Sequence, residues 1–114
     1  MTTIYKICPA VLWRNAVRDG WFRGSADDLR DGFIHFSTGA QVRGTAAKYF
    51  AGQRDLLLLG VDTERLGDRL KWEPARGGAL FPHLYGDMAL SAVSRIDMLG
   101  TGADGLPLFP SLPQ

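Results

Sequence analysis

The run DLLLLGVD at residues 55–62 restricts the fold of this chain more than any other feature. Apolar side chains occupy both faces of this segment, which is typical of a strand with a neighbour on each side. We therefore expect a sheet in which this strand is central. Alternating or β-branched apolar residues predict further strands at residues 3–8, 32–36, 69–73, 79–85 and 92–99. Pro82 interrupts the strand expected at residues 79–85, because proline leaves an unpaired position in a ladder.

Helices are expected in the first half of the chain. A helix is predicted between Pro9 and Gly20, and its apolar side is formed by Trp13, Ala16 and Val17. Residues 37–52 predict a second helix. Between the two, Ser25 and Asp28 have the spacing of a capping box, which predicts about one further helical turn.

This order of elements predicts an α+β fold. Two N-terminal helical segments are expected to pack on a curved or split, mainly antiparallel β-sheet with a central cleft, where a ligand site is expected. The chain of 114 residues is long enough for one domain, which we expect at residues 1–99. Residues 100–114 form a Gly/Pro-rich tail without a regular pattern, and it is expected to pack on the body through Leu106, Leu108, Phe109 and Leu112.

Composition and charge exclude several functions. The net charge of +1, with acidic and basic residues interleaved, argues against nucleic-acid or membrane partners. The chain has no signal-peptide pattern and no apolar run that could span a bilayer, so we expect a cytoplasmic protein. One cysteine, Cys8, allows no internal disulfide, and no metal site is expected because the two histidines lack ligand spacing. The sequence leaves the oligomeric state open.

The two histidines are the most informative polar residues, because both lie in apolar strand segments. Alternation along the strands places Phe33, His35 and Ser37 on one face, and groups Phe81, His83 and Tyr85 in the same way. A buried imidazole needs hydrogen-bond partners. Each histidine is therefore either a core residue bonded to a backbone carbonyl or part of the wall of a shared polar pocket. We favour the shared pocket, and this prediction rests more on His35 than on His83.

Three further segments carry candidate ligand groups. In STGAQ, Ser37 and Thr38 either cap the helix or border an anion at its N-terminus, and Gln41 begins a partly polar helix edge. Arg76, Gly77 and Gly78 form either a plain turn or an anion-binding loop, in which the glycines let backbone N–H groups approach a phosphate. Glu73 faces away from Trp72, so if Trp72 packs into the core, Glu73 faces water or the rim of a cleft.

Six segments carry a resemblance to a known family: IYKI, DGFIHFST, DLLLL, LKWE, ARGG and LFPHLYG. Over residues 4–99 the chain resembles the bacterial family known as domain of unknown function 952. This family resembles the ADP-ribosyltransferase-like fold, a pair of packed split sheets whose cleft holds NAD. The resemblance implies that His35 contacts the ribose, that Glu73 orients the ribose or the acceptor, and that Arg76 and His83 contact a pyrophosphate or a phosphorylated acceptor. It further implies that Ser37, Thr38 and Gln41 border the nucleotide, and that nicotinamide departs through an oxocarbenium-like state.

Three functions stay open at this point. The first is an NAD-using ADP-ribosyl transferase or hydrolase-like enzyme, with His35 and Glu73 catalytic and NAD as a substrate instead of a tightly bound cofactor. The second is a non-catalytic module that binds a nucleotide or a phosphorylated small molecule. In both, the ligand-binding residues are Ser37, Thr38, Gln41, Arg76, Gly77, Gly78, His83 and Tyr85. The third is a structural or interaction protein with core histidines.

The three hypotheses differ in what they require of the structure. The first two need His35, Arg76 and His83 to converge on one cavity. Catalysis further requires that Glu73 points into that cavity. The structural hypothesis instead predicts that each histidine is buried separately, with backbone partners.

Overall fold

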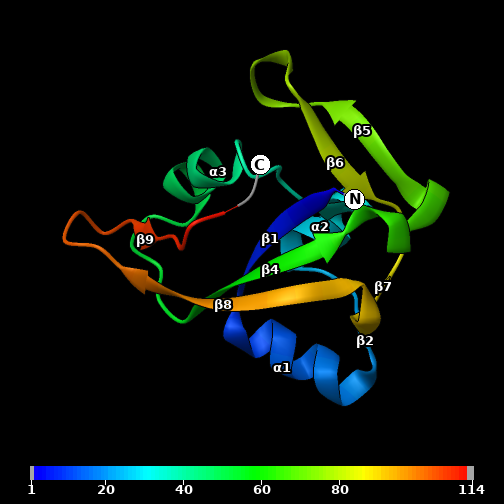
Figure 1. Cartoon of the computed structure of the whole chain (residues 1–114), viewed down its shortest axis with the longest axis horizontal. Coiled ribbons are helices and arrows are strands. Elements are labelled where there is room, and N and C mark those ends of the chain that lie inside the picture. The colour runs from blue at the N-terminus through cyan, green and yellow to red at the C-terminus, as the bar shows by residue number, and fades with distance from the viewer. Residues whose placement is uncertain (1, 113–114) are drawn as a thin grey trace.

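The main sheet of the protein has the predicted central strand in its interior (Figure 1). The computed structural model describes residues 2–112, and its fold is α+β. The four strands of this sheet lie in the order β1 (Thr3–Pro9), β4 (Leu56–Asp62), β8 (Val93–Thr101) and β9 (Pro107–Leu108). All neighbours in it are antiparallel. The apolar run is therefore paired on both sides, as expected.

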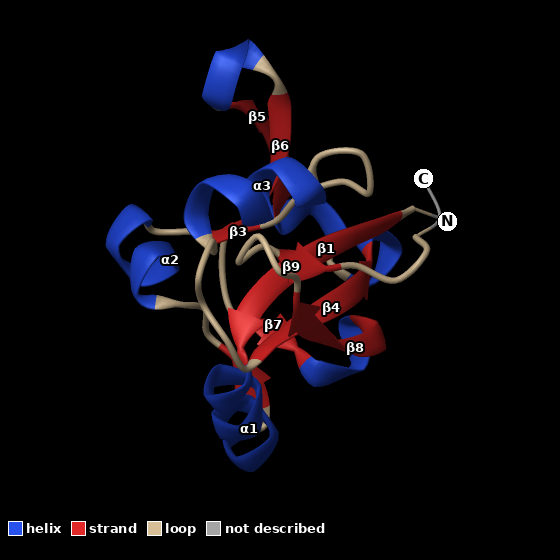
Figure 2. Ribbon diagram, turned by 90° about the vertical axis from the view of Figure 1, so that its left-hand side faces the viewer, coloured by secondary structure: helices blue, strands red, loops and turns tan. Residues whose placement is uncertain are grey.

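A second antiparallel sheet carries the segment with the second histidine. Its order is β3 (Ile34–His35), β6 (Leu80–Leu84) and β5 (Leu70–Pro74). Figure 2 shows the β5–β6 hairpin projecting from the body. Pro82 lies in the middle strand, where its carbonyl accepts from the N–H of Phe36 at 3.0 Å. Because proline cannot donate in return, the pairing stops there and β3 is only two residues long.

Two short strands were not predicted: β2 (Trp21–Phe22) and β7 (Met88–Ala89) pair with each other. Turns of 3-10 helix occur at Thr63–Arg65, Gly67–Arg69, Arg76–Gly78 and Leu90–Ala92. The helices are α1 (Ala10–Asp19), α2 (Ala26–Asp31) and α3 (Val42–Tyr49). In the described residues, no helix is both long and apolar enough to cross a membrane.

Alternation along β1 produces two core clusters, one on each face of the main sheet. Ile4 and Cys8 belong to the cluster that includes Ala16 of α1, whereas Tyr5 and Ile7 belong to the cluster that includes Ala46 of α3. Figures 1 and 2 show α1 and α3 on opposite sides of the sheet. Each helix therefore covers one apolar face.

The helices differ from the prediction in two respects. Val17 of α1 is 56% exposed, so the apolar side of this helix is narrower than expected. The second predicted helix begins only at Val42, because residues 38–41 form a turn. In this turn the Gln41 N–H donates to Oγ1 of Thr38, and the Thr38 N–H donates to Oε1 of Gln41. Side-chain bonds of this kind favour turns over helix interiors.

The tail is more regular than expected. Leu108 and Pro107 of β9 lie opposite Gly100 and Thr101 at the end of β8, so the prediction of no strand was wrong there. Phe109 and Leu112 pack against the α3 side of the core, whereas Leu108, which was also expected to pack, is 58% exposed. Residues 113 and 114 of the predicted tail lie outside the described residues.

Candidate functional site

A cleft of about 580 Å³ lies where the two larger sheets and the helices meet. Its walls come from the middle of β1, the start of α1, most of α2, β3, the end of α3 and parts of β5–β6. Both histidines line this cleft. The polar part of the cleft wall includes a buried ion pair between β1 and α2.

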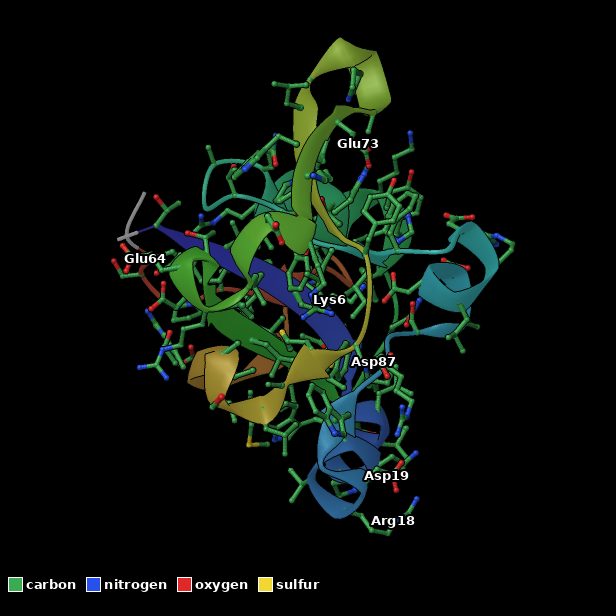
Figure 3. The ribbon with its side chains drawn as sticks, turned by 90° about the vertical axis from the view of Figure 1, so that its right-hand side faces the viewer. Lys6, Arg18, Asp19, Glu64, Glu73 and Asp87 are labelled. Carbon is green, nitrogen blue, oxygen red and sulfur yellow. The ribbon has the colours of Figure 1, made fainter. Side chains whose placement is uncertain are left out.

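That ion pair joins Lys6 of β1 to Asp28 of α2, and both side chains are buried. Figure 3 shows Lys6 near the middle of the molecule. Its Nζ lies 2.8 Å from Oδ2 of Asp28. Lys6 lies on the same face of β1 as Ile4 and Cys8, and its side chain is only 8% exposed, so water solvates its charge poorly. Such a cation is stable only when a carboxylate compensates it.

The Asp28 carboxylate accepts several hydrogen bonds. Besides Lys6, it accepts from the backbone N–H of Ser25 at 2.9 Å and from that of His35 at 3.1 Å. Ser25 completes the predicted capping box, because its Oγ accepts from the Asp28 N–H. Burial alone raises the pKa of the Asp28 carboxyl, but the bond from His35 and the charge of Lys6 outweigh burial and hold that pKa well below its usual range.

The His35 ring bridges two carboxylates of α2. Its Nδ1 lies 2.6 Å from Oδ1 of the buried Asp28, and its Nε2 lies 3.0 Å from Oδ2 of Asp31. The two contacts, one to each ring nitrogen, fix the orientation of the ring.

His83 is held by a carboxylate of its own, that of Glu73. Its Nδ1 lies 2.8 Å from Oε1 of Glu73, the same oxygen that accepts from Oη of Tyr85 at 2.7 Å. The bonds from His83 and Tyr85 lower the pKa of Glu73, and the bond to Glu73 raises the pKa of Tyr85. Glu73 lies on the projecting hairpin and is not among the residues that line the cleft (Figure 3).

Phe33 joins the two histidine groups. The β3–β6 register places His35 directly opposite His83, with ring centres 5.5 Å apart. The Phe33 ring stacks on His83 at 4.1 Å between centres and lies 4.6 Å from His35 and 5.3 Å from Tyr85. The two imidazoles therefore form one aromatic cluster at the cleft wall.

The other predicted ligand residues are placed differently. Ser37 lines the cleft, and its Oγ is 2.8 Å from Oγ1 of Thr45. Thr38 and Gln41 form the turn before α3, and Nε2 of Gln41 donates to the Leu80 carbonyl at 2.8 Å. Gly77 and Gly78 lie at the hairpin tip. The residues that line the cleft do not include Thr38, Gln41, Gly77 or Gly78. The side chain of Arg76 lies outside the described part of the structure.

Sequence reasoning missed the residues that orient His35. Lys6 carries a signal, because alternation places it between Ile4 and Cys8 on one apolar face of β1. Asp28 was assigned only a capping role, and Asp31 and its contact with the ring were not anticipated. Among the described residues, no group of three or more His, Cys, Asp or Glu side chains is arranged to hold a metal ion.

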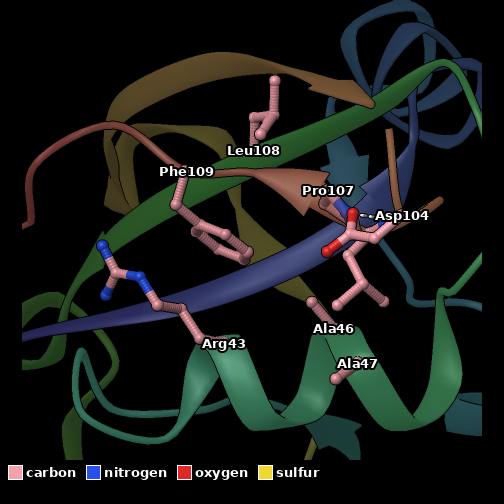
Figure 4. A pocket seen from close by; sticks show the side chains of 8 residues that line it. Arg43, Ala46, Ala47, Asp104, Pro107, Leu108 and Phe109 are labelled. Atoms are coloured by element: carbon pink, nitrogen blue, oxygen red, sulfur yellow. Dashed lines mark hydrogen bonds between the residues drawn. The ribbon is translucent and has the colours of Figure 1, made fainter. Parts of the chain in front are cut away.

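A second, smaller cavity of about 260 Å³ lies between α3 and the β9 segment. Figure 4 shows Arg43 facing Phe109 there, and its guanidinium carbon is 5.2 Å from the centre of the Phe109 ring. The same side chain donates to the carbonyl of Pro110 at 3.3 Å. No predicted site residue lines this cavity.

Cys8 is expected to be chemically inert in the folded protein. It is fully buried, and burial raises the pKa of its thiol to about 11, so little reactive thiolate exists at neutral pH. With a chromogenic disulfide reagent at pH 7.5, we expect labelling to be at least ~100-fold slower in buffer than in denaturant. Equal rates in the two conditions would contradict the buried position.

The fold and site together define a small α+β protein with a histidine-lined cleft of small-molecule size. Residues 7–96 match the family described as "Protein of unknown function (DUF952)", and the chain belongs to this family. The crystal structure of protein CC0527 from Caulobacter crescentus is similar, with 53% identity, 94% of each chain covered and a TM-score of 0.91. The solution NMR structure of the same protein has 54% identity, covers 94% of this chain and 92% of that one, and has a TM-score of 0.83. A comparison with curated proteins found no match.

Proposed function

We propose that the cleft binds a nucleotide or a phosphorylated small molecule, with His35 and His83 contacting it. The observation that carries this proposal is that two histidines from different strands line one cleft with ring centres 5.5 Å apart. Core histidines were expected to lie apart with backbone partners, whereas these rings bond to carboxylate side chains. A wall of oriented imidazoles suits recognition of a polar ligand.

The size and lining of the cleft support the same proposal. Its volume of about 580 Å³ lies within the range of small-molecule sites. Apolar groups, including Val11, Leu12 and Phe50, supply part of the wall and suit a flat ring. The histidines and Ser37 belong to the polar part of the wall, which also includes Lys6, Arg30 and the carboxylates of Asp27, Asp28 and Asp31. Polar groups of this kind set the orientation of a ligand.

An NAD-using reaction of the ADP-ribosyl type is a second candidate. The split antiparallel sheets around a cleft agree with an ADP-ribosyltransferase-like arrangement, and Glu73 is held in its ionised form by two donors. An ionised carboxylate can stabilise an oxocarbenium-like state when it lies beside it. Glu73 does not line the cleft, so its carboxylate would have to move to reach a ligand bound there. Binding alone needs no such movement and is therefore better supported.

Calorimetry with NAD, ADP-ribose and AMP tests the proposed site. We expect His35→Ala to weaken binding by at least about tenfold, because one hydrogen-bonding group of the cleft wall is lost. Arg43→Ala is the matched control: it removes a cation from the smaller cavity and is expected to leave affinity unchanged. Circular dichroism checks the folding of both variants.

Each outcome of this experiment is informative. Binding that survives in His35→Ala but is lost in Arg43→Ala would place the ligand in the smaller cavity. No binding of any of the three ligands to wild type would overturn the proposal. If NAD binds, release of nicotinamide that is lost in Glu73→Gln would favour the enzymatic candidate, and NAD recovered intact would favour binding alone.

A further inference from the structure

Only one nitrogen of the His35 ring is placed to contact a ligand. Nδ1 is held by Asp28, whose side chain is 1% exposed, inside the protein. Nε2 faces Asp31, whose side chain is 33% exposed. Any ligand group bound by this imidazole must therefore take the place of the Asp31 carboxylate.

Asp31 is held at this position by its neighbours and not by its helix. It is the last residue of α2, where the partial negative charge of the helix end disfavours a carboxylate. Two side chains lie beside it: Nε2 of His35 is 3.0 Å from Oδ2, and Nε of Arg30 donates to Oδ1 at 3.0 Å. Arg30 is largely exposed, so this set of charges is in contact with water and can rearrange.

We propose that the Asp31 carboxylate occupies the position of a ligand oxyanion, and that a phosphate or carboxylate group of the ligand binds His35 by displacing it. The inference rests on the proposed function and specifies the chemistry of the ligand group at Nε2. It also makes Asp31 an internal competitor that lowers affinity. The buried Asp28 stays in place throughout and keeps the ring oriented.

The chain contains a close control for this competition. Asp27 also lines the cleft and also pairs with Arg30, at 3.0 Å, but no contact joins it to His35 among the described residues. Asp27→Ala and Asp31→Ala therefore remove the same charge from the same cleft and the same arginine. Only the second change frees Nε2.

The test measures affinity for AMP and for adenosine, which lacks the phosphate. We expect Asp31→Ala to bind AMP about fivefold more tightly than wild type, the size typical of removing a partly exposed pair. Asp27→Ala should change AMP affinity by less than about twofold. Adenosine should bind all three proteins equally. Inorganic phosphate and acetate, titrated as competitors, show whether Nε2 prefers a phosphate or a carboxylate.

Two further variants make the result decisive. Asp31→Asn keeps the shape of the side chain without its charge and should show part of the gain. In the double variant His35→Ala/Asp31→Ala the gain should vanish. Equal gains in Asp27→Ala and Asp31→Ala, or a gain for adenosine, would overturn the inference as a general charge effect. If AMP binds wild type but Asp31→Ala shows no gain, the inference alone fails; if AMP binds no variant, the proposed function fails as well.

Discussion

Replacing Asp28 with asparagine is expected to lower the free energy of unfolding by about 3–5 kcal/mol, the cost of removing one partner of a buried ion pair. The amide cannot neutralise Lys6, whose side chain is 8% exposed. It also weakens the contact with Nδ1 of His35 and the capping of α2. Urea denaturation followed by circular dichroism measures the change.

Asp27→Asn is the control for this prediction. Asp27 precedes Asp28 on the same helical turn, but its side chain is 69% exposed, so we expect a change within about 0.5 kcal/mol. The double variant Lys6→Met/Asp28→Leu removes both buried charges and is expected to recover much of the stability lost in Asp28→Asn. Equal losses in Asp28→Asn and Asp27→Asn would show that the buried pair contributes nothing.

The pH dependence of stability gives a second readout of Asp28. The pKa of its carboxyl is lowered in the folded state, so the unfolded chain takes up the proton first as pH falls. The stabilisation is fully present above the unfolded pKa of about 4 and is lost as the pH falls towards the folded value. Wild type should therefore lose stability more steeply than Asp28→Asn below about pH 4.

Gly24→Ala is expected to destabilise the protein by about 3 kcal/mol, because backbone strain and a steric clash act together. The φ angle of Gly24 is +101°, a backbone conformation that residues other than glycine rarely adopt. An added Cβ would also lie 2.7 Å from Cβ of Asp28, which the ion pair holds in place. Thermal and urea unfolding measure the loss, and AMP calorimetry measures the effect on the cleft.

Gly20→Ala separates the two causes. Gly20 ends α1 with a φ angle of +89°, but an added Cβ there would meet nothing within 4 Å. Strain alone is expected to cost about 1–2 kcal/mol in this variant. A loss in Gly24→Ala no larger than that in Gly20→Ala would mean that Asp28 can move without cost, contrary to the role assigned to it.

The sequence predicts local features of this fold well, because they depend on neighbouring residues. The run at residues 55–62 identifies a strand paired on both sides, since both of its faces are apolar. Ser25 and Asp28 identify the start of α2, since a capping box is a local exchange of hydrogen bonds. The predicted interruption at Pro82 was wrong, because β6 runs unbroken from Leu80 to Leu84; the two-residue strand β3 is the one that ends opposite the proline.

The features that define the site are harder to predict because they join distant segments. Lys6 and Asp28 are 22 residues apart, and nothing in either segment identifies the other as its partner. The convergence of His35 and His83 depends on the register of β3 and β6, which a one-residue shift would destroy. The two-residue strand β9 depends on pairing with the end of β8, because its own sequence has little strand character.

The position of Phe33 has a consequence for how ligand binding can be observed. The chain contains two histidines, and both rings lie against this phenylalanine. The ring current of an aromatic side chain shifts the magnetic resonance of nuclei above its face and at its edge. The imidazole protons of the unlabelled protein therefore report on two residues that line the cleft. A ligand that moves either ring relative to Phe33 changes the chemical shifts of these protons, and only two histidines have to be assigned.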